Sequence, residues 1–354
     1  MGSRICNLTE KGVYIESEYE ISRRITMDYP FHVKDLRISD PFVLADPVTQ
    51  KYYTYASVIN PERFPGQKHA EEFHCIMSED LIHWSEPVKV FDRAETDFWG
   101  CRDYWAPECH YYKGRYYLIS SFRAPGTLRR CQALVADSPV GPFKPIADGP
   151  VTPEGWQCLD GTLFVDHHDK PWMVFCHEWT QVGDGQIAAV PLSDDLGERI
   201  GDPVILFRAS ESPWVSPFVS EGPCGFVTDG PFLHRMKDGT LIMLWSDFTD
   251  MGYATGYAKS ASGTLMGPWI QSKNPLYFHD GAHSMLFKTF DGKLMMSLHS
   301  PNRHPDKHML LFEMEERNGE LYIVNEITGN WYNFAERPKG TPFFKEPYED
   351  YRGL

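Results

Sequence analysis

The 354-residue sequence has no apolar run of the roughly 20 residues that a membrane-spanning helix needs. Its eight cysteines form no C-x-x-C pair, and their spacing does not suit a zinc site. It has no long block of like charge, which argues against a largely disordered chain. These absences leave a folded globular protein without a transmembrane segment or a cysteine-based metal centre.

Basic residues are fewer than acidic ones, with 34 Lys and Arg against 49 Asp and Glu. The formal net charge is −15 and the isoelectric point is about 5.4. An acidic surface repels nucleic-acid phosphates and anionic lipids, so we expect neither a nucleic-acid nor a membrane partner. The first 20 residues lack a basic segment followed by an apolar run, so we expect a cytoplasmic protein with reduced thiols. It would be secreted if a leader was removed and Met1-Gly2-Ser3 replaced it.

Long amphipathic helical patterns are missing too, and short aromatic and β-branched runs stand in their place. Five of these runs form a repeat, in which an apolar strand, a polar turn and a second apolar strand follow one another. The repeats begin at Asp40, Ala106, Asp160, Asp229 and Ala282. The turns recur at nearly the same offset as Lys113-Gly114, Asp169-Lys170, Asp238-Gly239 and Asp291-Gly292.

A second, weaker hairpin pattern follows each of these five hairpins, so each repeat predicts a four-stranded antiparallel sheet. Five such sheets indicate an all-β, five-bladed β-propeller around a central axis, with residues 1–354 as one catalytic domain. A generic β-sandwich is the alternative, but a sandwich does not require the same double hairpin five times.

The first strand of each propeller blade lines the central channel, so the five repeat starts are expected to converge on the axis. Three of the five are aspartates: Asp40, Asp160 and Asp229. One such residue is adequately explained as the cap of its own turn. Three carboxylates in register raise each other's pKa and cost stability, which favours a functional site. Hydrolysis of a glycosidic bond uses such a set, with one carboxylic acid and one carboxylate.

Aromatic residues near these strand starts are candidates for stacking on sugar rings. They are Trp99, Tyr104, Trp105, Trp179 and Trp214.

Four of the same segments resemble glycoside hydrolase family 43, over about Arg37 to His299. They are S-D-P-F at Asp40, W-A-P-E at Trp105, L-D-G-T-L-F-V-D at Asp160 and G-A-H-S at His283. The resemblance implies a five-bladed propeller in which Asp40 is the general base and Asp160 tunes and orients the general acid. It further implies that Trp105 walls the sugar pocket and that His283 lies on the axis near a water-coordinated cation. That ion is calcium or sodium, and no other cofactor is required.

The sequence departs from the family at the general acid, which usually stands in Glu-Gly-Pro before an apolar hairpin. Glu221 stands in S-E-G-P-C without such a hairpin, whereas Asp229 stands in T-D-G-P-F and the hairpin follows. We therefore assign the acid to Asp229, with Glu221 and Glu178 as alternatives. Aspartate is one methylene shorter, which sets the proton donor about 1.5 Å further back. His177 and Glu178 are also candidate sugar contacts, as is Glu221.

The predicted function is inverting hydrolysis of terminal α-L-arabinofuranosyl or β-D-xylosyl residues of oligosaccharides. One alternative is a retaining fructosidase-like propeller, because Glu108-Cys109 resembles the E-C motif of those enzymes; Glu108 is accordingly a candidate substrate-binding residue. A second alternative is a non-catalytic propeller that binds a glycan. Arg102 and Asp103 are expected to form a surface ion pair.

Overall fold

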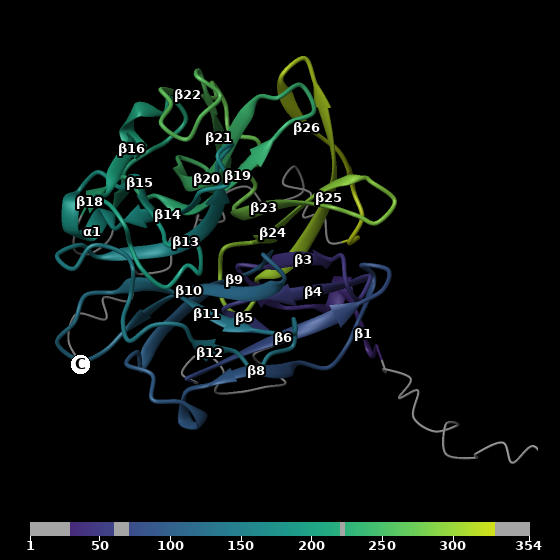
Figure 1. The fold of residues 1–354 in the computed structure, drawn as a ribbon. Helices are drawn as coiled ribbons and strands as arrows, with labels where there is room; N and C mark the ends of the chain where they lie inside the picture. The colour runs from purple at the N-terminus through teal and green to yellow at the C-terminus, as the bar shows by residue number, and fades with distance from the viewer. Residues whose placement is uncertain (1–28, 60–70, 220–223, 330–354) are drawn as a thin grey trace, which may run out of the picture.

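The computed structural model describes residues 29–59, 71–219 and 224–329. Over these residues the chain forms five four-stranded antiparallel sheets around a common axis (Figure 1). The prediction of a five-bladed β-propeller is thereby confirmed, and the sandwich alternative is wrong. Helix in the described residues is confined to α1 (Trp179–Val182) and three single 3-10 turns, η1 (Val33–Asp35), η3 (Arg93–Glu95) and η4 (Ala209–Glu211).

Each blade is built from strands that follow one another along the chain. Blade 1 comprises β3 (Phe42–Asp46), β4 (Lys51–Tyr55), β6 (Glu72–Ser78) and β8 (Val88–Asp92). Blade 2 comprises β9 (Arg102–Tyr112), β10 (Arg115–Arg123), β11 (Arg130–Ala136) and β12 (Lys144–Pro145). Blade 3 comprises β13 (Cys158–Val165), β14 (Pro171–His177), β15 (Gln186–Pro191) and β16 (Val204–Arg208). Blade 4 comprises β19 (Asp229–Arg235), β20 (Leu241–Thr249), β21 (Gly252–Ser260) and β22 (Trp269–Gln271). Blade 5 comprises β23 (Ala282–Lys288), β24 (Leu294–Ser300), β25 (His308–Arg317) and β26 (Glu320–Glu326).

Three short strand pairs lie outside the blades. They are β1 (Phe31–His32) with β7 (His83–Trp84), β2 (Ile38–Ser39) with β5 (Val58–Ile59), and β17 (Phe218–Val219) with β18 (Cys224–Gly225).

The turn chemistry explains why the first two strands of each blade return on themselves. Lys113 and Gly114 have φ values of 46° and 82°, the two left-handed residues of a two-residue hairpin turn. The twist of such a turn matches that of the flanking strands, so β9 and β10 pair directly through Tyr112 and Arg115.

The hydrophobic core is divided into one cluster for each pair of neighbouring blades. The cluster between blades 3 and 4, for example, joins Val174 of β14 to Met243 and Trp245 of β20, all fully buried. A fully buried side chain of this size contributes about 1.5–3 kcal/mol relative to an exposed one. Every blade therefore packs against a neighbour on each of its faces, and this packing fixes the positions of the five inner strands around the axis.

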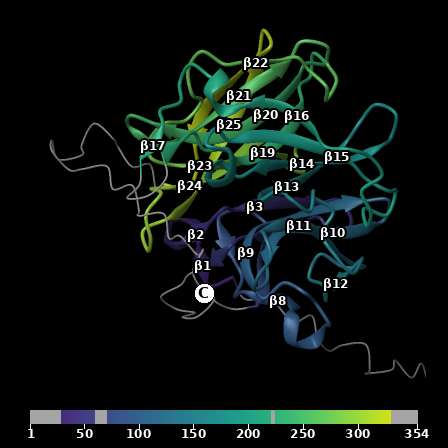
Figure 2. The ribbon, with the colours of Figure 1, turned by 90° about the vertical axis from the view of Figure 1, so that its left-hand side faces the viewer.

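The ring closes between blade 5 and blade 1 without an exchanged strand among the described residues. One cluster joins Phe42 and Val43 of β3 to Met295 of β24. The backbone just before blade 1 also pairs with blade 5, since Ile38 donates its N–H to the Lys307 carbonyl at 2.9 Å. The inner strands β3, β9, β13, β19 and β23 consequently gather around the axis (Figure 2).

Candidate active site

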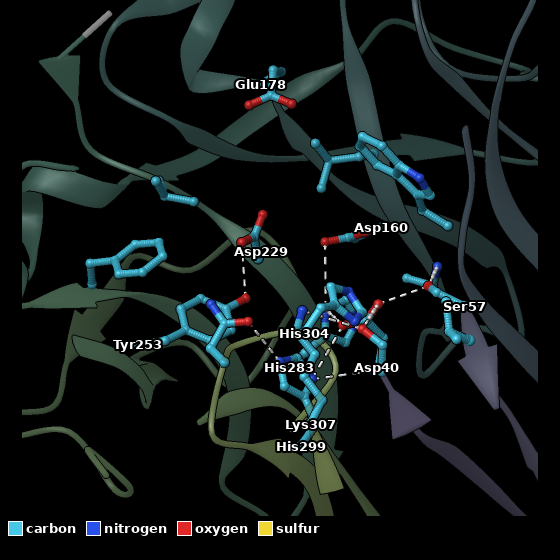
Figure 3. Close-up of a pocket in the computed structure, with 18 of the residues that line it drawn as sticks. Asp40, Ser57, Asp160, Glu178, Asp229, Tyr253, His283, His299, His304 and Lys307 are labelled. Atoms are coloured by element: carbon cyan, nitrogen blue, oxygen red, sulfur yellow. Dashed lines mark hydrogen bonds and ion pairs between the residues drawn. The ribbon is translucent and has the colours of Figure 1, made fainter. Parts of the chain in front are cut away.

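A pocket of about 300 Å³ opens at one end of the axis. This volume is at the lower end of the range typical of small-ligand sites. The pocket is lined by side chains from four of the inner strands, from the segment just before β3, and from the ends of the second strands and the loops that follow them (Figure 3). The predicted site residues that line it are Asp40, Trp105, Asp160, Glu178, Asp229 and His283.

In each blade, a residue with a left-handed backbone stands where the inner strand, or in blade 1 the chain just before it, meets the pocket. The φ values are 55° at Asp40, 45° at Ala106, 54° at Asp160, 50° at Gly230 and 57° at His283. A left-handed non-glycine residue costs about 1–2 kcal/mol, so backbone strain recurs at the level of the pocket in every blade except blade 4, where the residue is a glycine. The strand register also shifts at this point in β9, β13, β19 and β23, as it does at β-bulges that re-aim side chains.

These left-handed residues correct the alignment of the repeats. Asp40, Ala106 and Asp160 are equivalent, as expected, but their counterparts in blades 4 and 5 are Gly230 and His283. Asp229 therefore enters the pocket from one position earlier than Asp40 and Asp160 do. The short polar turns and small residues at the strand starts left this offset of one residue undetermined in the sequence.

Hydroxyl and imidazole groups hold the Asp40 carboxylate. Ser57 donates to Asp40 Oδ2 at 2.7 Å and Ser39 donates to the same oxygen at 3.1 Å. The Nδ1 atom of His283 lies 3.6 Å from Asp40 Oδ1. Because Ser57 also accepts the Ala106 N–H at 2.7 Å, it ties the carboxylate of blade 1 to the inner strand of blade 2.

The charges around Asp40 keep it ionised. Burial raises the pKa of Asp40, but the nearby His283 and Lys307 and the hydrogen bond from Ser57 act against burial, and this pKa lies below its usual range. Burial also lowers the pKa of His299 to about 3, so its ring is neutral near neutral pH. The neutral ring accepts the Asp40 N–H on Nδ1 at 3.2 Å and faces Asn302 Oδ1 with Nε2 at 3.1 Å.

Asp160 is 5% exposed and is bound across the boundary between two blades. Its Oδ2 accepts the N–H of Gly230 at 2.9 Å and lies 3.9 Å from His283 Nδ1. Burial raises the pKa of Asp160 well above its ordinary value, and the negative charges of Asp40 and Glu178 add to this effect. The Gly230 hydrogen bond opposes the rise without reversing it.

Asp229 has the opposite protonation state to Asp40. Burial raises the pKa of Asp229 to about 8, and the charges of Asp160 and Glu178 add to that rise. The Tyr253 hydroxyl donates to Asp229 Oδ2 at 2.9 Å, which leaves the other oxygen to carry the proton. Near neutral pH the pocket therefore holds an ionised Asp40 and a protonated Asp229, both directed into the same cavity (Figure 3).

A buried ion-pair triad supports the wall between blades 2 and 3. Arg129 is 2% exposed; its Nη1 donates to Glu178 Oε2 at 2.9 Å and its Nε donates to Asp103 Oδ2 at 3.1 Å. The guanidinium also lies 3.9 Å from the ring centroid of Trp105, in a cation–π contact. The predicted surface pair of Arg102 and Asp103 is wrong, because Asp103 is buried and bonded to Arg129.

Aromatic rings form a continuous wall beside Asp229. Trp179 packs on Phe218 at a centroid distance of 5.7 Å, Phe218 on Phe248 at 4.6 Å, and Phe248 on Tyr253 at 4.9 Å. All four line the pocket, so its apolar side suits the face of a sugar ring. Of the aromatic candidates, Tyr104, Trp105 and Trp179 line the pocket, whereas Trp99 and Trp214 do not.

Three other candidate residues lie away from this cavity or outside the described residues. His177 stacks on Trp156 at 4.1 Å, and its two ring nitrogens bond Gln186 and Gln181, so it packs behind the pocket. Glu108 lies deeper along the axis and bonds His110 at 2.9 Å. Glu221 lies outside the described residues.

The described residues do not supply a closed metal site. No group of three or more His, Cys, Asp or Glu side chains among them is arranged to hold a metal ion. His283 faces Asp40 and Asp160, so its imidazole is the side chain that would hold an axial cation, with water as the other ligands. The catalytic steps derived below use no cation.

The sequence reasoning missed several residues that shape the site, namely Ser57, Tyr253, His299, Asn302 and Lys307. A signal for two of them was present. Ser57 follows the second strand of its blade, and His299 lies near the end of its second strand, at the level where Ser121 and Ser246 also stand. These residues occupy equivalent positions on or just after the second strands of the repeats, which is a signal present in the sequence.

Buried carboxylates of opposed protonation beside an aromatic wall, at the axis of a five-bladed propeller, suit the hydrolysis of a glycosidic bond. The chain belongs to glycosyl hydrolases family 43, whose profile matches residues 32–320. It is similar to a crystal structure of an endo-arabinase from Bacteroides thetaiotaomicron VPI-5482, with 42% identity, a TM-score of 0.76, and coverage of 83% of this chain and 99% of that one.

Two curated proteins are also similar. The extracellular exo-alpha-(1->5)-L-arabinofuranosidase ArbA of Cellvibrio japonicus (strain Ueda107) is 23% identical over 256 residues, which is 63% of this chain and 71% of that protein. Xylosidase/arabinosidase 43A of Humicola insolens is 32% identical over 110 residues, which is 30% of this chain and 33% of that protein. The chain is therefore a glycosidase of the arabinanase and xylosidase type.

The sequence predicts reduced thiols. The described cysteines are free, and most of them are buried. Within the described residues, no helix has the length and apolar character needed to span a membrane.

Proposed function

We propose that this enzyme hydrolyses α-L-arabinofuranosidic bonds of oligosaccharides with inversion at the anomeric carbon. The observation that carries the proposal is the opposed protonation of two aspartates in one pocket. Asp40 is held ionised by the positive groups around it, and Asp229 has its pKa raised to about 8. Two carboxyl groups whose environments push their pKa values apart are typical of a general acid and base pair.

Asp40 is the general base of this proposal. It takes a proton from a water molecule as the water oxygen forms its bond to the anomeric carbon. Ser57 and Ser39 both donate to Asp40 Oδ2, which supports the use of the other oxygen for the water. Attack from the face opposite the leaving group inverts the anomeric configuration.

Asp229 is the general acid, and its proton passes to the glycosidic oxygen as the bond between that oxygen and the anomeric carbon breaks. Glu178 is less suited to this role, because its ion pair with Arg129 stabilises the ionised carboxylate, which has no proton to give. The shorter aspartate requires the leaving oxygen to approach the β19 backbone about 1.5 Å more closely. Tyr253 fixes the carboxyl group in the orientation that this approach needs.

Asp160 orients and tunes the acid in this proposal. It lies next to Asp229 in the pocket, and its ionised form raises the pKa of Asp229 (Figure 3). Its bond to the Gly230 N–H couples it to the residue that follows Asp229.

The arabinofuranosyl substrate is supported by the names of the endo-arabinase and of the exo-acting arabinofuranosidase to which the chain is similar. β-D-Xylosides are the second candidate, since one similar protein is called a xylosidase/arabinosidase. Both are pentosides that can stack on the aromatic wall beside Asp229.

Proton NMR of the products tests the proposal. The purified enzyme is incubated with aryl α-L-arabinofuranosides, aryl β-D-xylosides and arabino-oligosaccharides, and the first-formed anomer is recorded. We expect an inverted product from an arabinofuranoside. A product of retained configuration would overturn the inverting mechanism and favour a covalent intermediate of the fructosidase type. Binding without turnover of any substrate would instead favour a glycan-binding propeller.

A further inference from the structure

A ring of hydrogen bonds connects the five blades at the level of the active site. In all five steps, the left-handed residue of one blade donates its N–H to a side chain of the preceding blade, and in four of them the acceptor stands on or just after the second strand of that blade. These four bonds are Ala106 to Ser57 at 2.7 Å, Asp160 to Ser121 at 3.5 Å, His283 to Ser246 at 3.0 Å and Asp40 to His299 at 3.2 Å. These bonds offset part of the left-handed strain.

The acceptors occupy one equivalent position in the blades. Each stands on or just after the second strand, opposite the residue that precedes the left-handed one. The paired positions are Ser121 with Trp105, Ser246 with Asp229, and His299 with Ala282. In blade 1, Ser57 donates its backbone N–H to the Ser39 carbonyl, which places it at the same point.

Blade 3 departs from this pattern. Its equivalent residue is Cys176, which pairs with Leu159 and is completely buried in the core between blades 3 and 4. A thiol is a much weaker hydrogen-bond acceptor than a hydroxyl or an imidazole. The N–H of Gly230 is instead accepted by Oδ2 of Asp160, at 2.9 Å. Blade 3 therefore lacks a strong acceptor at this position, and its active-site carboxylate, Asp160, accepts the N–H from blade 4 in its place.

We propose that Cys176 is a positioning residue. Its thiol does not compete for the Gly230 N–H, which therefore bonds Asp160 and holds Asp160 against β19, the strand that contains Asp229. The inference rests on the proposed function in so far as Asp160 acts on the general acid. Cys176 lies outside the pocket and affects turnover only through the hydrogen bond between Gly230 and Asp160.

The alternative acceptor explains why the identity of this residue matters. A serine at position 176 is nearly the same size but offers the hydroxyl that Ser121 and Ser246 use in their blades. That hydroxyl would compete for the Gly230 N–H and release Asp160 toward His283, whose Nδ1 already lies 3.9 Å away. A displacement of about 1 Å at a catalytic group can lower the rate about a hundredfold.

The test compares Cys176→Ser with Cys176→Ala, using kcat and KM separately on the best substrate of the panel. Neither alanine nor cysteine competes strongly for the N–H, whereas serine does. We expect Cys176→Ser to lose about tenfold or more in kcat with a much smaller change in KM, and Cys176→Ala to lose far less of kcat. Thermal unfolding of both variants confirms that each is folded.

Equal losses of kcat in the two variants would mean that Cys176 acts through packing alone and would overturn the proposal. So would a Cys176→Ser enzyme with the kcat of the wild type. A crystal structure of the Cys176→Ser variant gives a readout that needs no turnover: we expect the Gly230 N–H to bond the introduced hydroxyl. If it still bonds Asp160, the proposal is wrong even where the wild type proves active. If the bond moves while the wild type hydrolyses no substrate, the proposed function fails and the positioning role stands.

Discussion

The two sides of the pocket contain the same kind of residue in opposite environments. On the side of blades 5 and 1, Asp40 lies among His283, His299 and Lys307. On the side of blades 3 and 4, Asp160 and Asp229 lie with a third carboxylate, that of Glu178. The first side stabilises an ionised carboxylate and the second stabilises a protonated carboxyl group. Neighbouring charges, rather than the residue type, therefore decide which aspartate is the base and which is the acid.

Arg129 does not cancel this difference, although it lies on the carboxylate side. Its guanidinium is shared between Asp103 and Glu178, so one positive charge meets two negative charges. The triad therefore retains a net negative charge, and the Glu178 carboxylate still raises the pKa of Asp229. Substitutions on the two sides should therefore affect opposite protonation steps.

Loss of the base on the positive side should have the largest effect. We expect Asp40→Asn to lower kcat by about 10³-fold, within the range usual for general base catalysis, because the amide cannot take the proton of the attacking water. Steady-state kinetics on an aryl arabinofuranoside measures the loss. Asp291→Asn is the matched control, since Asp291 is exposed in a hairpin turn. Wild-type turnover by Asp40→Asn would remove Asp40 from the mechanism.

Loss of the acid on the carboxylate side should depend on the leaving group. We expect Asp229→Asn to lower kcat by about 10²-fold or more on an arabino-oligosaccharide, whose sugar leaving group needs a proton. An aryl glycoside with an acidic phenol needs little protonation, so its rate should fall much less. Equal losses on both substrates would show that Asp229 is not the proton donor and would return attention to Glu178.

Changing one charge on each side should move opposite limbs of the pH profile. The basic limb of kcat/KM should lie near pH 8 in the wild type, where Asp229 loses its proton. Glu178→Gln removes a charge that raises this pKa, so the basic limb should move to lower pH. Lys307→Met removes a charge that lowers the pKa of Asp40, so the acid limb should move to higher pH.

Lys293→Met in the same blade is the control for the lysine variant, because its side chain is 55% exposed and pairs with Glu313 on the surface. It should leave both limbs where the wild type has them. Movement of the same limb by Glu178→Gln and Lys307→Met would contradict the division of the pocket into two sides.

The smallest effect concerns stability. The pKa of Asp229 is about 8 in the folded state and about 3.9 in an unfolded chain. A raised pKa stabilises the folded state fully below the unfolded value, and this contribution is lost as the pH rises through the folded value. Asp229→Asn has no proton to lose. Its melting temperature relative to the wild type should therefore rise by a few degrees between pH 5 and pH 9, as measured by calorimetry.

Much of this enzyme could be predicted from its sequence, because its repeats are local. Alternating apolar residues and polar turns, such as Lys113-Gly114, specify each hairpin within about 20 residues, and five copies specify the propeller. The same repeats brought Asp40, Asp160 and Asp229 to one axis, which the structure shows. They did not resolve the offset of one residue in blades 4 and 5, because a β-bulge changes the backbone without changing the apolar pattern.

The tertiary structure alone decided how these residues are charged and held. Asp40 and Asp229 are the same amino acid, and their different protonation depends on His283 and Lys307 at one side and Glu178 at the other, from distant parts of the chain. Burial and Coulomb interactions depend on distance in space, which local sequence patterns do not encode. The sequence thus determined which side chains meet at the axis, and the packing of the blades decided which of them keeps its proton.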